Sequence, residues 1–293
     1  MRIAVLGSQA SWYLDDLRRA AADQHTIVSV GYRGLLSQVD ANQMTLYAGG
    51  EDLRNFDALL VRSMPPGSLE QVVFRMNALA QLDSAGVRVV NSPRAIEIAI
   101  DKYLTTVKLQ EAGLLVPKTV ACQTCEQALE SFVAMQGNVV VKPLFGGEGR
   151  GITRVSDAAI ALRVFKSLEQ IGAAIYLQEF VPHEGCDLRV MVIGEKVLGM
   201  RRRHPQDWRT NISRGAVAEP LEVTPELAAL AHRAAAAVGT DIAGVDFLPG
   251  TNGKLYALEV NAVPGWKALA RATDVDVGRL VIEYLDGSNE TRR

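Results

Sequence analysis

The stretch that most constrains this chain is "VVVKPLFGGEGRGITRV", residues 139–155. It has glycine at positions 146, 147, 149 and 151, directly after an apolar run that ends in a lysine. Glycine loses more conformational freedom on folding than any other residue, so this loop is either a flexible connector or a place where backbone must approach something closely. Both flanking runs resemble strands, which predicts a hairpin with the glycines in its turn. Walker loops and dinucleotide-binding loops place their glycines before a helix, so neither applies.

The composition is typical of a globular protein and excludes several classes of partner. The 293 residues are 48% apolar and 22% charged, which suggests two or three domains. The formal net charge of -2 offers no basic excess for nucleic acid or an anionic membrane. The sequence has only three cysteines, Cys122, Cys125 and Cys186, and this small, odd number argues against the disulfide framework of a secreted protein. No apolar run is long enough for a signal-peptide core or a membrane span, and we therefore expect a cytoplasmic location.

The order of strand-like and helix-like segments predicts an α/β (α+β) fold. Strand patterns at 2–7, 26–32, 57–63 and 87–92 alternate with helical patterns, including 69–85, and this alternation predicts a parallel sheet in a unit spanning 1–95. Residues 96–174 form a second unit that contains the glycine loop. Residues 175–293 form a third, with hairpins whose turns lie near Gly194 and at "GTNG".

Three oxygen-bearing side chains come together in the last hairpin. Glu259 and Asn261 in "LEVN" are two residues apart and share one face of a strand, and Asp246 lies on the preceding strand. Buried carboxylates without partners are costly, and a hard cation such as Mg²⁺ relieves that cost. The residues alone leave a second reading open, in which these side chains face solvent.

Two lysines, one of them directly before the glycine loop, suggest an anionic ligand. Lys142 ends the strand before the loop and Lys102 begins a helix that follows the capping residue Asp101. A lysine suits phosphate oxygens, and a glycine loop could fold over a triphosphate and offer backbone N–H groups. Either lysine taken alone could equally be an ordinary surface residue.

Taken together, these motifs make the chain resemble an ATP-grasp ligase of the RimK-like branch, which attaches glutamate or related amino acids to a carboxylate. The resemblance extends over nearly the whole chain. It is carried by "NSPRAIEIAIDKYLT", "VVVKPLFGGEGRGI", "LQEFV", "GCDLRVMVIG", "TNISRGA", "GVDF" and "LEVNAVPG". It implies a Rossmann-like pre-ATP-grasp domain at 1–95, and two α+β subdomains, at 96–174 and 175–293, that clamp a nucleotide.

The resemblance also implies a role for each matching residue. ATP would be bound by Lys102, Lys142, Gly146, Gly147, Gly149, Gln178, Glu179, Phe180, Val181, Asp187 and Asn211. Within that set, the backbones of Glu179 and Val181 would pair with adenine, Asp187 would lie near the ribose and Asn211 near the phosphates.

The metal and substrate residues follow from the same resemblance. Two Mg²⁺ or Mn²⁺ ions would be held by Asp246, Glu259 and Asn261. Substrate would be contacted by Arg62, Arg189, Arg203 and Arg214, of which Arg203 and Arg214 would act in catalysis with Lys142. Strand alternation places Arg201 and Arg203 on one face and Arg202 on the other. We favour Arg203 and leave Arg202 open.

The implied function is an ATP-dependent carboxylate–amine ligase that forms an acyl phosphate and adds L-glutamate to an acceptor. The loop "NAVPGWKAL", with Trp266, favours a small planar acceptor of the pterin type, although Trp266 could simply be packed. The alternatives are a protein tail, from a ribosomal protein or an amino-group carrier protein, and a non-catalytic ATP-binding regulator. We expect a homo-oligomer, either a dimer or a tetramer.

Overall fold

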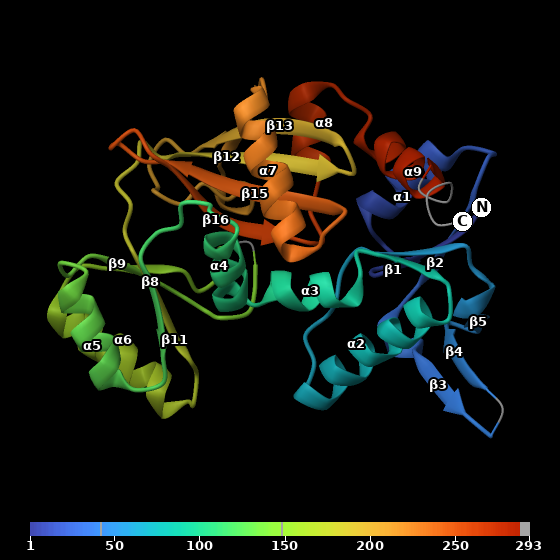
Figure 1. Ribbon diagram of the computed structural model, residues 1–293, viewed down its shortest axis with the longest axis horizontal. Coiled ribbons are helices and arrows are strands. Elements are labelled where there is room, and N and C mark those ends of the chain that lie inside the picture. Colours follow the sequence, from blue (N-terminus) through green and yellow to red (C-terminus); the bar gives the residue numbers. More distant parts are fainter. Residues whose placement is uncertain (42, 148, 288–293) are drawn as a thin grey trace.

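The computed structural model describes residues 1–41, 43–147 and 149–287, and arranges them around three larger sheets and one small one (Figure 1). The mixture of parallel and antiparallel sheets with helices confirms the predicted α/β (α+β) class. Within the described residues, no helix is both long and apolar enough to cross a membrane.

The N-terminal unit is built on a parallel sheet, as the strand–helix alternation predicted. Its strand order is β2 (Thr26–Val30), β1 (Arg2–Leu6), β6 (Ala58–Val61) and β7 (Arg88–Val90). Helices α1 (Trp12–Ala21) and α2 (Leu69–Ser84) connect these strands, and α2 begins with a capping box between Ser68 and Gln71. A small antiparallel sheet of β3 (Leu36–Val39), β4 (Met44–Ala48) and β5 (Glu51–Asp52) was not predicted.

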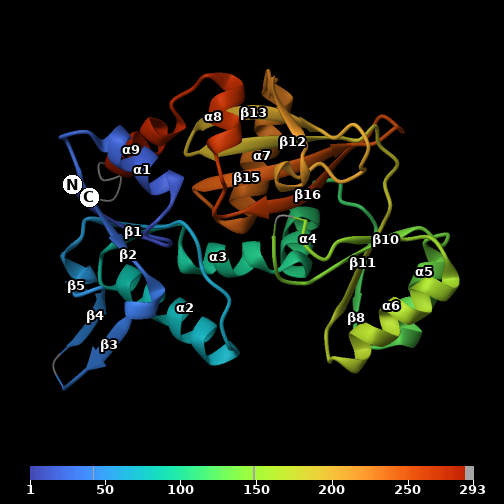
Figure 2. The same cartoon turned by 180° about the vertical axis from the view of Figure 1, so that it is seen from behind.

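Two short helices lead out of this unit toward the rest of the chain (Figure 2). Helix α3 (Pro93–Ile100) is capped by the Ser92 hydroxyl, and α4 (Lys102–Glu111) is capped by the Asp101 carboxylate. Both caps accept the free N–H groups of a first helical turn, as the sequence predicted.

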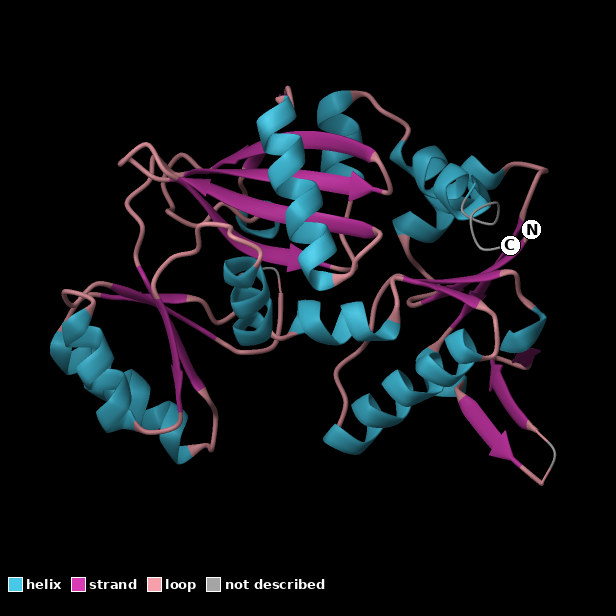
Figure 3. Ribbon diagram, in the orientation of Figure 1, coloured by secondary structure: helices cyan, strands magenta, loops and turns pink. Residues whose placement is uncertain are grey.

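The central sheet is antiparallel and carries the glycine loop. Its order is β10 (Thr153–Val155), β9 (Val139–Lys142), β11 (Ile175–Glu179) and β8 (Thr119–Cys122), with α5 (Cys125–Ala134) and α6 (Ala158–Gln170) packed on one face (Figure 3). Strands β9 and β10 pair as the predicted hairpin. Strand β11 pairs with β8 and β9, so the central sheet continues past the boundary predicted at residue 174. Strand pairing depends on long-range contacts that the local pattern does not encode.

The C-terminal sheet supplies most of the cavity described below. Its order is β14 (Val217–Leu221), β13 (Lys196–Arg203), β12 (Cys186–Ile193), β15 (Ile242–Pro249) and β16 (Leu255–Asn261). The chain then forms α8 (Lys267–Thr273) and α9 (Val277–Gly287). Alternate residues of β12 and β15 enter two different cores, one with α7 (Pro225–Val238) and one with α1 and α9.

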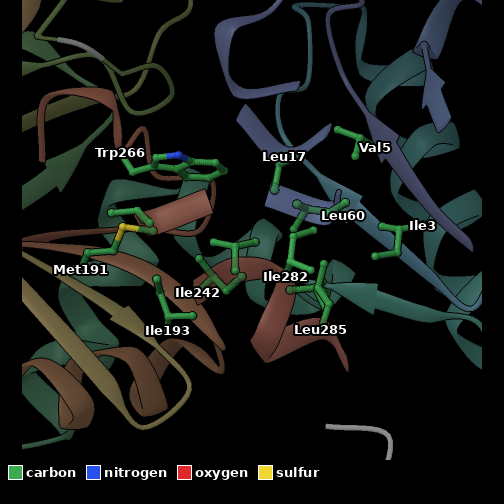
Figure 4. Packing of buried hydrophobic residues seen from close by; sticks show 14 of the residues in the cluster. Ile3, Val5, Leu17, Leu60, Met191, Ile193, Ile242, Trp266, Ile282 and Leu285 are labelled. Carbon is green, nitrogen blue, oxygen red and sulfur yellow. The ribbon is translucent and has the colours of Figure 1, made fainter. Parts of the chain in front are cut away.

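The second of these cores joins the two ends of the chain (Figure 4). Apolar side chains from the N-terminal sheet and α1 meet Met191, Ile193 and Ile242 of the C-terminal sheet and Ile282 and Leu285 of α9. Shared burial of this kind holds the N-terminal sheet at one position relative to the C-terminal sheet. Side chains from both sheets can therefore line one cavity.

Candidate active site

A cavity of about 580 Å³ lies between the glycine loop, the C-terminal sheet and the edge of the N-terminal unit. Ten of the residues predicted from the sequence line it: Arg62, Lys102, Gly146, Gly147, Gly149, Arg189, Asn211, Asp246, Glu259 and Asn261. The predicted phosphate and metal groups thus share one space, although they are separated by up to 159 positions in the sequence.

The glycine loop lies against the start of α4 and against Asn211. The Lys102 ammonium donates to the Gly146 carbonyl, and the Lys102 backbone N–H donates to the Leu144 carbonyl at 3.3 Å. Gly149 has a φ of +71°, and a Cβ placed there would overlap the amide of Asn211. Glycine is therefore required at 149 both for the backbone conformation and for the close approach of Asn211.

The three oxygen-bearing residues predicted as metal ligands lie on adjacent strands. Asp246 and Glu259 face each other across β15 and β16, and a β-bulge follows where the register shifts after Asp246. Asn261 lies two residues further along β16, and its Oδ1 accepts from the Val263 N–H at 2.8 Å. Two carboxylates and one amide oxygen at a cavity wall are a donor set that fits a hard divalent cation. In the described residues, no three His, Cys, Asp or Glu side chains form such a group, so the third oxygen would be that of Asn261.

Asp246 is also the centre of a buried chain of ion pairs. Arg189 binds both of its carboxylate oxygens, at 2.6 and 2.7 Å, and Arg202 approaches one of them at 2.9 Å. Burial by itself would raise the pKa of Asp246, but the charges of Arg189 and Arg202 lower it to about 2. The carboxylate is therefore ionised at neutral pH, as a metal ligand needs to be.

The structure shows where Asp187 and the arginines at the end of β13 lie, and their predicted roles stay predictions. Both oxygens of Asp187 accept from Arg202, at 2.7 and 2.5 Å, and Asp187 is 4% exposed; its contact with a ribose stays a prediction. Burial raises the pKa of Asp187. Arg202 lines the cavity, whereas Arg203 is exposed and does not. The alternation along β13 separates these two arginines as predicted, and Arg202, which the sequence left open, is the one at the cavity wall.

Arg214 also lies outside the cavity. It is exposed in the short helix Ile212–Arg214, where its guanidinium is 3.8 Å from the Asp207 carboxylate. Its neighbours Ile212 and Ser213 do line the cavity. The catalytic roles of Arg203 and Arg214 thus stay predictions that this geometry does not support.

Lys142 lies beside the cavity rather than on its wall. Its ammonium donates to the side-chain Oε1 of Gln178, and the side-chain Nε2 of Gln178 in turn donates to Thr119 Oγ1 at 2.9 Å and to the Tyr176 hydroxyl at 2.8 Å. Burial lowers the pKa of Lys142 to about 8, the nearby Glu259 carboxylate opposes this, and Lys102 adds to it. Lys142 is therefore a charged group that the fold accommodates at a cost.

This cost gives a pH dependence that can be measured. The pKa of Lys142 in the fold, about 8, is below its ordinary value of 10.5, so the unfolded chain binds more protons between these values and stability should rise with pH across that window. Lys142→Met should remove this pH-dependent part of the free energy of unfolding, which is at most about 3 kcal/mol. Urea unfolding measures this at pH 7 and pH 10. Between these pH values, the free energy of unfolding of wild type should rise relative to that of the variant. The exposed Lys254→Met is the control, and parallel pH profiles for wild type and Lys142→Met would contradict the assignment.

The segment predicted to lie beside adenine makes most of its contacts with other parts of the protein. The backbone N–H of Glu179 donates to the Lys118 carbonyl at 2.9 Å, and its carboxylate accepts from the Lys118 N–H at 3.0 Å. Val181 is buried against Leu248 and Tyr256. Gln178 and Glu179, at the end of β11, and Phe180 and Val181, which follow it, do not line the cavity. Their contact with a base stays a prediction.

Several residues that line the cavity had no role assigned from the sequence. Tyr13 belongs to α1 and Lys267 and Arg271 to α8, whereas Arg150 belongs to the glycine loop and Arg202, which the sequence left open, to β13. Only the spacing of Lys267 and Arg271, four positions apart in a helix, could have signalled that they share a face. Trp266 is fully buried and donates to the Asp16 carboxylate at 2.9 Å, so its indole packs the core and cannot stack on an acceptor.

The chain is similar to known proteins over its whole length. Residues 1–96 match the model of the RimK PreATP-grasp domain, and residues 99–285 match that of the RimK-like ATP-grasp domain. A tetrahydromethanopterin:alpha-L-glutamate ligase of Methanosarcina acetivorans is 34% identical over 280 residues, covering 85% of this chain and 86% of the relative. The protein of the same name from Methanococcus maripaludis is 30% identical, covering 97% of each.

The fold is also similar to that of a solved structure. The ATP-grasp ligase PsnB, complexed with minimal precursor, Mg and ADP, superposes with a TM-score of 0.77 at 21% identity, covering 97% of this chain and 96% of PsnB. The two family models together match the chain from residue 1 to residue 285, and the relatives that are 30% or more identical cover most of it. The chain therefore belongs to the RimK-like ATP-grasp family of ligases.

Proposed function

We propose that this ligase uses ATP and Mg²⁺ to join L-glutamate to a carboxylate on a small, pterin-type acceptor. The observation that carries the proposal is the shared cavity, in which the glycine loop and Lys102 face the oxygens of Asp246, Glu259 and Asn261. The glutamate and the pterin-type acceptor are supported by the two relatives named tetrahydromethanopterin:alpha-L-glutamate ligase.

The residues of the chain account for the chemistry that such a reaction needs. A carboxylate is a poor electrophile until a phosphoryl group converts it into an acyl phosphate, which an amine can attack. Bound Mg²⁺ would neutralise charge on the phosphates, and Asp246, Glu259 and Asn261 would hold it. Lys102 and the backbone N–H groups of the glycine loop would orient the phosphates, and the closed loop would exclude water from the reacting carboxylate.

The arginines at the cavity divide into two kinds. Arg189 and Arg202 are tied to Asp246 and keep that carboxylate ionised and oriented. Arg62 reaches the cavity from the N-terminal sheet, stacks on the rings of Tyr13 and Trp266 at 4.9 and 4.2 Å, and would contact the acceptor. An assembly into a dimer or tetramer, a second metal ion and use of Mn²⁺ are further parts of the proposal.

A substrate screen tests the proposal directly. With ATP, Mg²⁺ and L-glutamate present, a pterin-type carboxylate should give steady ADP release and a product enlarged by glutamyl residues, read by mass spectrometry. Release only with a ribosomal-protein tail or an amino-group carrier protein would move the acceptor to the protein class. Nucleotide binding with no ADP release from any acceptor would favour the non-catalytic alternative.

A further inference from the structure

The side of the cavity formed by α1, α8 and the loop between β16 and α8 is strongly basic. Arg62, Lys267 and Arg271 line it together with Tyr13 and Gly265. The Arg62 guanidinium is 4.9 Å from the Tyr13 ring centroid, and the Lys267 ammonium is 5.3 Å from that of the adjacent Trp12. The two rings are in edge contact, with centroids 5.3 Å apart, and therefore lie between the Arg62 and Lys267 side chains in one continuous set of contacts.

Unlike Arg189 and Arg202, these three cations have no carboxylate partner among the described residues. Arg189 and Arg202 are paired with Asp246 and Asp187. Arg62, Lys267 and Arg271 form no ion pair with any residue in 1–41, 43–147 and 149–287. Arg62 donates from Nη2 to the Pro264 carbonyl at 2.8 Å, while its buried Nε has no hydrogen-bond partner among the described residues.

Such an arrangement is unfavourable unless an anion completes it. A buried guanidinium N–H without an acceptor loses its hydration and gains nothing in return. Lys267 and Arg271 are four positions apart on α8, and like charges at that spacing repel. Carboxylate or phosphate oxygens placed between the three side chains would satisfy Arg62 and relieve the repulsion.

We propose that Arg62, Lys267 and Arg271 form an anion subsite for the acceptor, which therefore has at least one negatively charged group besides the carboxylate that is activated. This inference rests on the proposed ligase function and narrows its acceptor to polyanions. Tyr13, which lines the cavity beside the subsite, favours the acceptor over L-glutamate as the source of that charge, because its ring offers a surface that glutamate cannot use.

Binding of a graded series of probes tests the subsite without requiring turnover. Pteroate, pteroylglutamate and pteroyldiglutamate have the same ring system and one, two and three carboxylates. Their affinities are measured calorimetrically on the full chain with a non-hydrolysable ATP analogue and Mg²⁺. Wild type should bind more tightly as carboxylates are added. The double variant Lys267→Gln, Arg271→Gln should lose about tenfold or more for the two larger probes and remain within about twofold for pteroate.

A matched control and a second substrate complete the design. The double variant Lys166→Gln, Arg233→Gln makes the same charge change on exposed positions of α6 and α7, away from the cavity, and should bind as wild type does. The KM for L-glutamate should not change in either variant. The subsite would be overturned if wild type bound all three probes equally or failed to bind the larger two. It would also be overturned if the cavity variant lost the same affinity for all three probes, or if only its KM for glutamate changed. Charge-graded binding without ADP release would instead count against the ligase function alone.

Discussion

Glu259→Gln should lower turnover by about 10²- to 10³-fold, because an amide replaces one of the two carboxylates of the cavity wall that we propose as metal ligands. Steady-state ADP release at saturating ATP, acceptor and glutamate measures this. The concentration of Mg²⁺ needed for half-maximal activity should rise in the same variant. Excess Mg²⁺ should therefore recover part of the lost rate.

The fold should tolerate this change. In the described parts of the chain, Glu259 has no ion-pair partner within 4 Å, so its removal leaves no buried arginine uncompensated. We expect a loss of less than about 1 kcal/mol in the free energy of unfolding. Glu219→Gln, on β14 and outside the cavity, is the matched control and should keep wild-type turnover. Wild-type rates in Glu259→Gln would exclude Glu259 as a metal ligand.

Asp246→Asn should differ from Glu259→Gln in stability, because it should lower the free energy of unfolding strongly in addition to its effect on activity. Asp246 is 7% exposed and compensates two arginines, Arg189 and Arg202. Removing one member of a buried ion-pair network leaves uncompensated charge and costs about 3–5 kcal/mol. Urea unfolding followed by circular dichroism should show the midpoint moving down by a corresponding amount.

An exposed ion pair provides the control for this measurement. Glu283 pairs with Lys196 at 3.0 Å, with both side chains about half exposed. Glu283→Gln removes the same charge and should cost less than about 1 kcal/mol. If Asp246→Asn and Glu283→Gln unfold at the same urea concentration, the buried network does not contribute as the structure indicates.

Local sequence pattern was sufficient for features that depend on residues close together in the chain. The pairing of β9 with β10 around the glycine loop follows from two strand-like runs joined by a short turn. The shared wall of Asp246, Glu259 and Asn261 follows from a hairpin in which alternate residues face one side. The capping residues Ser92 and Asp101 likewise determined where α3 and α4 begin.

The face of β13 that lines the cavity could not be read in this way. Alternation separates Arg202 from Arg203, but the sequence does not say which of the two faces is inward. That choice depends on Asp187 and Asp246, which lie on β12 and β15 and attract Arg202. The same limit explains the placement of β11 in the central sheet, because its partners β8 and β9 are distant in the sequence.

The sequence by itself determined the glycine loop, the helix caps and the oxygen-bearing hairpin, since each depends on backbone conformation and side-chain spacing within one short segment. Only the tertiary structure decided that Arg62 and Tyr13, from the N-terminal unit, meet Lys267 and Arg271 at one cavity and that Trp266 is buried. The physical reason is the core shared by β1, α1, β12 and α9, since packing between distant segments fixes their relative position and no local pattern records it.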